Sequence, residues 1–209
     1  VTLTGGSMVN AGAVIGSGFL GGQPTNITMD IGGNLTLGTG TADMSSARIG
    51  SPSANIAGGD ISIVVNGDVT LASSTVANTR SVIRTLGSLT LDANNITAGG
   101  RLISGQQTIT AAGNLTVAAL NAVNAVVTAT GPQNITAGDT LTVQGGAGTG
   151  LSASITGSGG QNISASGINV TGGSVGNSSF AEIAQTGVAG SQVITINEGG
   201  TLTLLGGPS

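Results

Sequence analysis

Short runs of alternating apolar and polar residues recur along this chain, and several of them end at a pair of glycines. Three such runs are Leu-Thr-Val at 141–143, Ile-Asn-Val at 168–170 and Leu-Thr-Leu at 202–204, each followed by one residue and then Gly-Gly. Alternation with a period of two predicts β-strands that turn one face toward a core. The abundance of Gly and of β-branched residues, without a 3.6-residue period, excludes helical repeats.

Between these runs the chain repeats two further strand-like segments in a constant order. Residues 153–155 and 161–165 separate the first two runs, and residues 181–183 and 192–196 separate the second and third. The first residues of the three runs are spaced by 27 and then by 34 positions. Spacings in this range indicate a solenoid, so we predict a repeat of three short strands.

The amino-terminal part of the chain has the same order with a constant spacing. Leu35 follows Val1 by 34 positions, and Val69 follows Leu35 by 34. If these positions stack in successive turns, apolar residues lie over apolar residues inside. The predicted pairs are Leu3 with Leu37, Ile27 with Ile61, Met29 with Ile63, Ile31 with Val65, and Ile49 with Ile83.

The register is ambiguous between residues 82 and 114. Ile followed six positions later by Leu recurs at 83/89, 96/102 and 109/115, a spacing of 13 that fits half of a 26-residue turn. We interpret this region as shorter turns with smaller corner loops. The longer pattern returns at residues 115–117 and leads to Leu141 after 26 positions.

Together these patterns predict an all-β fold, a parallel β-helix (β-solenoid) with three short strands per turn and about seven turns. A β-sandwich would need antiparallel hairpins with tight turns, which this constant three-part order does not suggest. We expect residues 1–209 to form a single β-solenoid segment. We also expect an excerpt of a longer repeat protein, because the chain opens in mid-pattern at Val1 without an initiating Met or a signal peptide.

Composition agrees with a core of small aliphatic side chains stacked in layers. The 209 residues include 39 Gly, 2 Phe and no Trp or Tyr, but 38% are hydrophobic, which disfavours disorder. Every apolar run is too short to span a membrane as a helix. The only cations are four Arg, and the net charge is −4. We therefore expect no nucleic-acid partner and no membrane insertion.

Recurrent motifs give the chain a family resemblance. They are Gly-Gly-Asn-Leu-Thr-Leu (32–37), Ala-Gly-Asn-Leu-Thr-Val (112–117), Asn-Ile-Thr-Ala-Gly (95–99 and 134–138) and Gly-Gly-Thr-Leu-Thr-Leu (199–204). In these the chain resembles the filamentous haemagglutinin-like exoproteins of Gram-negative bacteria, which are two-partner-secreted adhesins. The resemblance implies a right-handed β-helix that forms part of an adhesin shaft.

The inventory of reactive side chains favours a non-enzymatic protein. The chain has no His, Cys or Lys, so the commonest bases, nucleophiles and metal ligands are missing. Asp60 and Asp92, with Arg84 and Arg101 nearby in sequence, are the least implausible catalytic cluster of a carbohydrate-active enzyme. The alternative, which we favour, is that the acids are solvated corner charges. The acidic residues are Asp30, Asp43, Asp60, Asp68, Asp92, Asp139, Glu182 and Glu198.

Two further chemistries are weakly indicated. Calcium binding of the repeat-in-toxin type would need an Asp at a fixed place after glycine pairs such as Gly199-Gly200, and that Asp is missing. We therefore expect no cofactor, no metal site and no catalytic residue. Asn-x-Ser/Thr sequons recur, and we attribute them to an Asn at a bend followed by a strand, with glycosylation as the alternative. These sequons begin at Asn26, Asn34, Asn95, Asn114, Asn134, Asn162, Asn169 and Asn177.

The function that these observations predict is structural. We expect an extracellular β-helical shaft at a bacterial cell surface, serving adhesion, a biofilm matrix or a filament. Its partners would be adjacent repeats or copies of itself placed end to end, and glycans of a host cell or matrix. The alternatives are a carbohydrate-active β-helix enzyme and a segment of a phage fibre.

Overall fold

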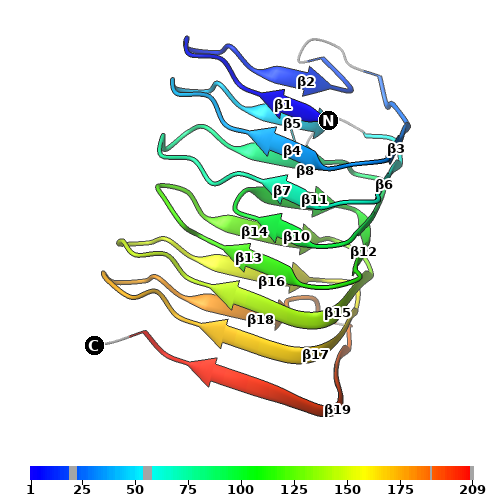
Figure 1. The fold of residues 1–209 in the computed structure, drawn as a ribbon, viewed down its shortest axis with the longest axis vertical. Coiled ribbons are helices and arrows are strands. Elements are labelled where there is room, and N and C mark those ends of the chain that lie inside the picture. The colour runs from blue at the N-terminus through cyan, green and yellow to red at the C-terminus, as the bar shows by residue number, and fades with distance from the viewer. Residues whose placement is uncertain (19–22, 54–57, 189, 208–209) are drawn as a thin grey trace.

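The protein is built from parallel β-strands that stack as successive rungs, from β1 at one end to β19 at the other (Figure 1). The computed structural model describes residues 1–18, 23–53, 58–188 and 190–207. No helix occurs within these ranges. The prediction of an all-β fold is confirmed, and the parallel strands in curled sheets are consistent with a β-solenoid.

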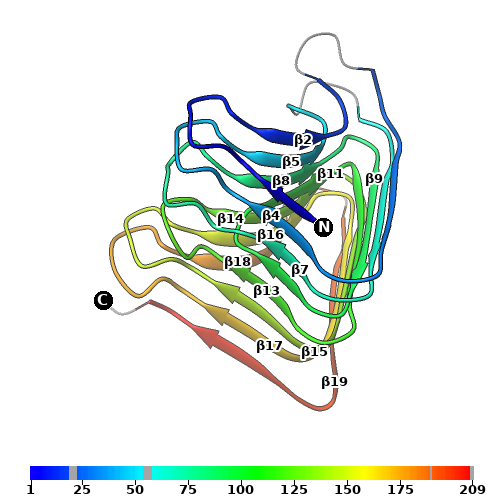
Figure 2. The same cartoon turned by 45° about the horizontal axis from the view of Figure 1, so that its top comes forward.

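As far as β14, strands three places apart in the chain pair with one another, which produces three stacks of strands. Figure 2 shows the stacks as sides around a common interior. The first stack contains β1 (Thr2–Thr4), β4 (Leu35–Gly38), β7 (Val69–Leu71), β10 (Ile96–Ala98) and β13 (Leu115–Ala118). The second is a 7-stranded sheet of β2 (Ala13–Ile15), β5 (Ala47–Gly50), β8 (Ser81–Arg84), β11 (Arg101–Ser104), β14 (Ala125–Ala129), β16 (Ala153–Gly157) and β18 (Ala181–Gln185). The third contains β3 (Ile27–Ile31), β6 (Ile61–Val65), β9 (Ser88–Ala93) and β12 (Gln106–Ala111).

Three long strands join the first and third stacks into one 12-stranded sheet. They are β15 (Gln133–Gln144), β17 (Gln161–Thr171) and β19 (Gln192–Leu205). The sequence predicted two separate short strands in each of these places. In β15 the register shifts between Ala137 and Thr140, so a bulge replaces the expected corner loop.

The predicted register of the first turns is confirmed. Every expected pair is found: Leu3 with Leu37, Ile27 with Ile61, Met29 with Ile63, Ile31 with Val65, and Ile49 with Ile83. The spacing of 34 also appears in side-chain contacts between rungs, such as the Asp60 backbone N–H that donates to Asn26 Oδ1 at 2.9 Å. A one-residue slip would turn these apolar side chains outward.

The 13-residue unit between 82 and 114 is not half a turn. Ile83, Ile96 and Ile109 lie on β8, β10 and β12, one in each stack. Ile96 pairs with Leu115, 19 positions later. The spacing therefore spans two steps between stacks, because β9 lies between β8 and β10, and β11 lies between β10 and β12. The prediction of shorter turns in this region is confirmed.

The interior is filled by aliphatic side chains in columns that run along the stack. Leu35, Leu37, Ile49, Ile83 and Leu102 are each fully buried. Burial of a Leu or Ile side chain contributes about 1.5–3 kcal/mol, so these columns are the main stabilising element. Aromatic residues are not needed because each layer is narrow.

One interior column is polar. Gln107, Gln133 and Gln161 are buried and occupy the same register position on β12, β15 and β17. Gln133 Nε2 donates to Gln107 Oε1 at 2.7 Å, and Gln161 Nε2 donates to Gln133 Oε1 at 2.6 Å. Gln192 on β19 extends the column by donating to Gln161 Oε1 at 2.6 Å. Each buried amide thus meets its neighbour along the stack, as buried polar groups require.

Candidate functional site

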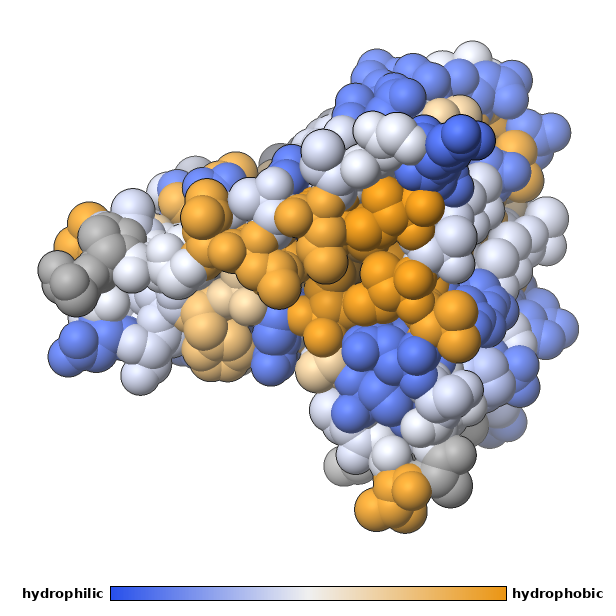
Figure 3. All heavy atoms as spheres, turned by 90° about the horizontal axis from the view of Figure 1, so that it is seen from below, coloured by the Kyte–Doolittle hydropathy of each residue, from blue (hydrophilic) through white to orange (hydrophobic). Residues whose placement is uncertain are grey.

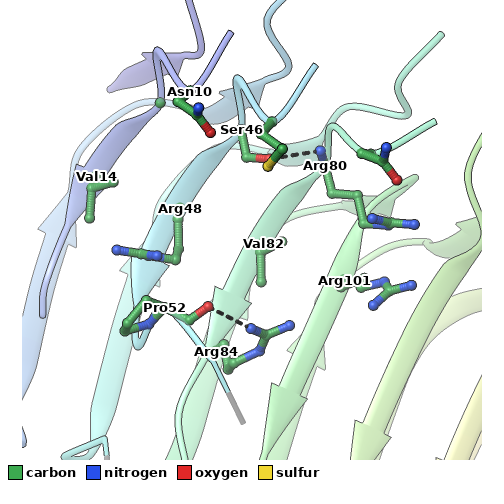
Figure 4. A pocket seen from close by; sticks show the side chains of 12 residues that line it. Asn10, Val14, Ser46, Arg48, Pro52, Arg80, Val82, Arg84 and Arg101 are labelled. Carbon is green, nitrogen blue, oxygen red and sulfur yellow. Dashed lines mark hydrogen bonds between the residues drawn. The ribbon is translucent and has the colours of Figure 1, made fainter. Parts of the chain in front are cut away.

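A groove on the outer face of the 7-stranded sheet gathers all four cationic side chains of the chain. Its volume is about 680 Å³. It is lined by Asn10, Gly12, Val14, Met44, Ser46, Arg48, Pro52, Asn78, Arg80, Val82, Arg84 and Arg101. We call it the arginine groove (Figure 4). The chain has eight acidic residues, and none of them lies in this lining.

Strand alternation turns these arginines outward while their neighbours fill the core. Ile49, Ile83 and Leu102 are fully buried inside, so the side chains next to them on β5, β8 and β11 point to the opposite face. Arg48 and Arg101 are both paired in register with Val82. They therefore flank Val82 on the two neighbouring strands.

Two more arginines complete a diamond around Val82. Arg84 lies two positions after Val82 on β8, and Arg80 lies two positions before it, directly ahead of the strand, so both are on its outward side. Figure 4 shows Val82 at the centre, with an arginine on each of its four sides. Val82 is only 8% exposed although it faces outward, so the floor of the groove is apolar and largely shielded from water.

Hydrogen bonds to loop backbone hold two of the arginines in place. Arg48 Nη2 donates to the Ser17 carbonyl oxygen, and Arg84 Nη1 donates to the Pro52 carbonyl oxygen, each at 3.0 Å. The backbone N–H of Arg80 donates to Ser46 Oγ at 3.0 Å. The first two contacts fix the guanidinium groups of Arg48 and Arg84 against loops, whereas the third holds only the backbone of Arg80.

Three other hydrogen-bond donors of the groove lack an acceptor among the described residues. The Nε atoms of Arg80, Arg84 and Arg101 are buried and have no hydrogen-bond partner among the described residues. A buried donor without an acceptor costs about 1–3 kcal/mol, and more when it is charged. The groove therefore holds cationic donors that a suitable acceptor would satisfy.

Burial and mutual repulsion in the groove both disfavour the charged form of its arginines. Burial lowers the pKa of Arg101, and the neighbouring Arg80 and Arg84 lower it further. Burial also lowers the pKa of Arg84, with a contribution from Arg80, and that of Arg48, with a contribution from Arg84. Guanidinium groups keep their charge because their ordinary pKa is so high. The four positive charges consequently repel one another across a partly dry surface.

The acidic half of the predicted catalytic cluster lies elsewhere. Asp60 precedes β6, and its Oδ1 accepts a hydrogen bond from the backbone N–H of Ser88 at 2.8 Å. Asp92 is exposed on β9, next to Val64 and Thr110 in register. Arg84 and Arg101 line the groove without them, so the structure does not assemble the cluster.

The sequons coincide with a second row of contacts, at the corner where strands begin. Asn95 Oδ1 accepts from the backbone N–H of Asn114 at 2.8 Å, and Asn95 Nδ2 donates to Asp68 Oδ1 at 2.9 Å. Asn34 Oδ1 accepts from the backbone N–H of Asp68 at 2.9 Å. The interpretation that Asn is needed at the bend therefore has a physical basis at these positions, since each side chain ties one rung to the next.

Metal chemistry and membrane spanning have no visible basis in the described part of the chain. No group of three or more acidic side chains there could hold a metal ion. No helix that is long and apolar enough to cross a membrane is found in the same residues.

Sequence reasoning missed the arginine groove because the four arginines are spread over residues 48–101. The fold brings them together in one groove although they are far apart in the sequence. One signal was available: with Ile49 paired to Ile83, Arg48 must face Val82. Comparison with protein-family models, with curated proteins and with solved structures gave no match.

Proposed function

We propose that this protein is a structural rod, a segment of an extracellular shaft of a bacterial surface adhesin or filament. The observation that carries the proposal is the unbroken parallel pairing in all three stacks from β1 to β19. A stack of this kind contacts only its nearest neighbours and grows by repetition. The proposed coil is right-handed, as in the family that the sequence motifs resemble.

The geometry suits a shaft because length follows directly from the number of turns. Three strand segments make one turn, and β15, β17 and β19 each supply two segments, so the 19 strands correspond to about seven turns. At about 4.8 Å per turn the rod is roughly 34 Å long. The fully buried columns, represented by Leu37, Ile83 and Leu102, tie each turn to the next.

At the β19 end of the rod, the last apolar side chains of the interior columns are exposed. Leu202 and Leu204 are paired with Ile168 and Val170, yet they are 52% and 66% exposed. Figure 3, which looks at the rod from below, shows a broad apolar area on this end. An uncovered apolar face beside an open strand edge favours addition of a further strand.

The proposed occupant of this face is a further turn of the same kind, supplied by an adjacent repeat or by the β1–β3 end of a second copy of the chain. The two ends are complementary, because the free edges of β1, β2 and β3 match the three stacks that end at β18 and β19. A head-to-tail contact of this kind does not close on itself and produces filaments.

Electron microscopy of the purified chain with two matched variants tests the proposal. We expect rods that lengthen with protein concentration. Leu204→Asp places a charge on the apolar end and should stop the lengthening. Val193→Asp is the control, because Val193 is also exposed on β19 but pairs with the outward-facing Asn162. Particles of one fixed length, or equal effects of both variants, would contradict end-to-end growth.

The proposed location is the outside of a bacterial cell, and adhesion or a biofilm matrix is the proposed role. Its support is the resemblance of the sequence motifs to secreted adhesins. Protease treatment of intact cells that produce the protein should release it; protection until the cells are lysed would contradict this location. The enzyme alternative gains no support, since Asp60 and Asp92 lie outside the arginine groove.

A further inference from the structure

The arginine groove has no task in a purely structural rod. Four like charges on one side of one sheet repel one another, and three of the guanidinium groups keep a buried Nε without a hydrogen-bond partner among the described residues. An arrangement that costs stability at its own site indicates a ligand that compensates the cost.

We propose that the arginine groove binds a small molecule that carries two phosphoryl groups. Val82 forms the floor, and Arg48, Arg80, Arg84 and Arg101 surround it. The groove volume of about 680 Å³ lies within the range of small-molecule sites.

The positive charge of the four arginines indicates how many anionic groups the ligand carries and of which kind. A phosphomonoester carries about −1.5 to −2 at neutral pH, so two of them match the four positive charges of the groove. Sulfate esters and carboxylates carry a single charge each and would leave half of the cationic charge uncompensated. Guanidinium forks also bind phosphate oxygens in a bidentate manner.

The arginines fall into two pairs that fit two phosphoryl groups. Repulsion connects all four arginines, because Arg101 is repelled by both Arg80 and Arg84, and Arg84 in turn repels Arg48. The directions of the side chains therefore decide the proposed pairs. In Figure 4 the side chains of Arg80 and Arg101 extend toward the same side of the groove, away from Arg48. The backbones of Arg48 and Arg101 are two strand spacings apart, about 10 Å. One phosphoryl group would bridge Arg80 and Arg101, and the other would bridge Arg48 and Arg84.

The short extent of the charge favours a small ligand over a polyanionic chain. The cations lie on three neighbouring strands, β5, β8 and β11, and at the residue that directly precedes β8. The next outward positions along the same row are Val14 on β2 and Val126 on β14. A nucleic acid, which presents a charge every few ångströms, would find no further cations beyond these four in either direction.

Isothermal titration calorimetry with inorganic pyrophosphate as the probe tests the site. Calorimetry is chosen because the chain has no Trp or Tyr whose intrinsic fluorescence could report binding. We expect one pyrophosphate per chain and at least about tenfold weaker binding of inorganic phosphate, which engages one arginine pair. Absence of pyrophosphate binding at millimolar concentration would overturn the proposal.

Variants locate the binding. Arg101→Met keeps the aliphatic stem but removes the charge, and it should weaken pyrophosphate binding at least about tenfold. The pyrophosphate affinity of Arg101→Lys should lie between those of the native protein and Arg101→Met, since Lys keeps the charge but loses the bidentate guanidinium. Gln144→Glu on β15 makes the same change in net charge on an exposed residue outside the groove. If Gln144→Glu weakens binding as much as Arg101→Met, net charge alone explains the effect and the site is refuted.

A thermal melt by circular dichroism guards against a variant that simply fails to fold. Pyrophosphate should raise the melting temperature of the native protein and leave that of Arg101→Met unchanged. Should Arg101→Met not fold, Arg80→Met serves in its place with the same expectation. An equal rise in the native protein and in a folded variant would contradict binding in the groove.

Two further arms identify the source of the phosphoryl groups. Phosphatidylcholine vesicles containing phosphatidic acid present a phosphomonoester on a lipid surface. Vesicle binding that pyrophosphate displaces supports a lipid headgroup as the natural ligand, and pyrophosphate binding without vesicle binding supports a soluble one. A single-stranded oligonucleotide that binds more tightly than pyrophosphate, and less tightly to Arg101→Met, would replace the small-ligand proposal with nucleic-acid binding.

Discussion

The buried glutamine column offers a sharp test of how polar groups are satisfied inside this fold. Gln133 lies in the middle of it, accepting from Gln161 and donating to Gln107. The column begins abruptly, because Gln107 is paired with the apolar Leu89, and Gln107 Nε2 is buried without a hydrogen-bond partner among the described residues.

Replacing Gln133 by Leu should strand two additional buried groups, Gln107 Oε1 and Gln161 Nε2. Each stranded group costs about 1–3 kcal/mol, so Gln133→Leu should lower the free energy of unfolding by about 2–6 kcal/mol. Gln107→Leu should be nearly neutral. It strands Gln133 Nε2 but removes the Gln107 Nε2 that already lacks a partner.

The double variant Gln107→Leu with Gln133→Leu should regain most of the stability that Gln133→Leu loses. It strands only Gln161 Nε2, so the number of unsatisfied groups returns to that of the native protein. Urea unfolding followed by far-ultraviolet circular dichroism measures the three variants and their coupling free energy. A double variant no more stable than Gln133→Leu would refute the assignment of the loss to unpaired amides.

Three other substitutions probe the stack in the same unfolding assay. Gly50→Ala should lower the free energy of unfolding by more than about 1 kcal/mol, because Gly50 has a φ of 97° and an added Cβ would overlap the Arg84 carbonyl oxygen. Gly33→Ala is the control and should be nearly neutral, because there is open space around Gly33. Equal losses of stability in the two variants would refute the steric reason. Leu102→Ala should lower the free energy of unfolding by about 2–5 kcal/mol because it leaves an interior cavity. A loss below about 1 kcal/mol would mean that neighbouring side chains move in and fill the cavity. Asn95→Ala should cost about 0.5–1.5 kcal/mol by removing the acceptor for the next rung, and no loss would show that water replaces this contact.

The sequence was sufficient for the register wherever consecutive turns have equal length. A constant spacing of 34 placed Ile27 over Ile61 and Ile49 over Ile83, and the structure confirms both pairs. It was insufficient where turn length changes, because a spacing of 13 fits two steps between stacks as readily as half a turn. Only the pairing of Ile96 with Leu115 decides between them.

The arginine groove was harder to predict than the fold for the same reason. Arg101 reaches the diamond only because Leu102 stacks on Ile83, 19 positions earlier, in the region of irregular spacing. The glutamine column was similarly hidden. Gln precedes Asn-Ile at 133 and 161, but a polar residue at a strand start reads as exposed unless the stack brings another amide next to it.

Rod growth and ligand binding should be separable, since they depend on different parts of the stack. Leu204 lies on the terminal strand β19, whereas Arg101 lies on β11, and neither strand pairs with the other. Effects at distant sites without shared partners add independently. Leu204→Asp should therefore shorten the rods seen by electron microscopy while pyrophosphate binding stays within about twofold of the native value.

Arg101→Met should show the opposite pattern, with native rod length and weakened pyrophosphate binding. Removing one of four mutually repelling charges should also leave the rod at least as stable as the native protein at low ionic strength, where the repulsion is least screened. The difference in stability should shrink toward about 0.15 M salt. If Arg101→Met instead shortened the rods, the arginine groove would be part of the shaft, and its charge would need an explanation within the structural function.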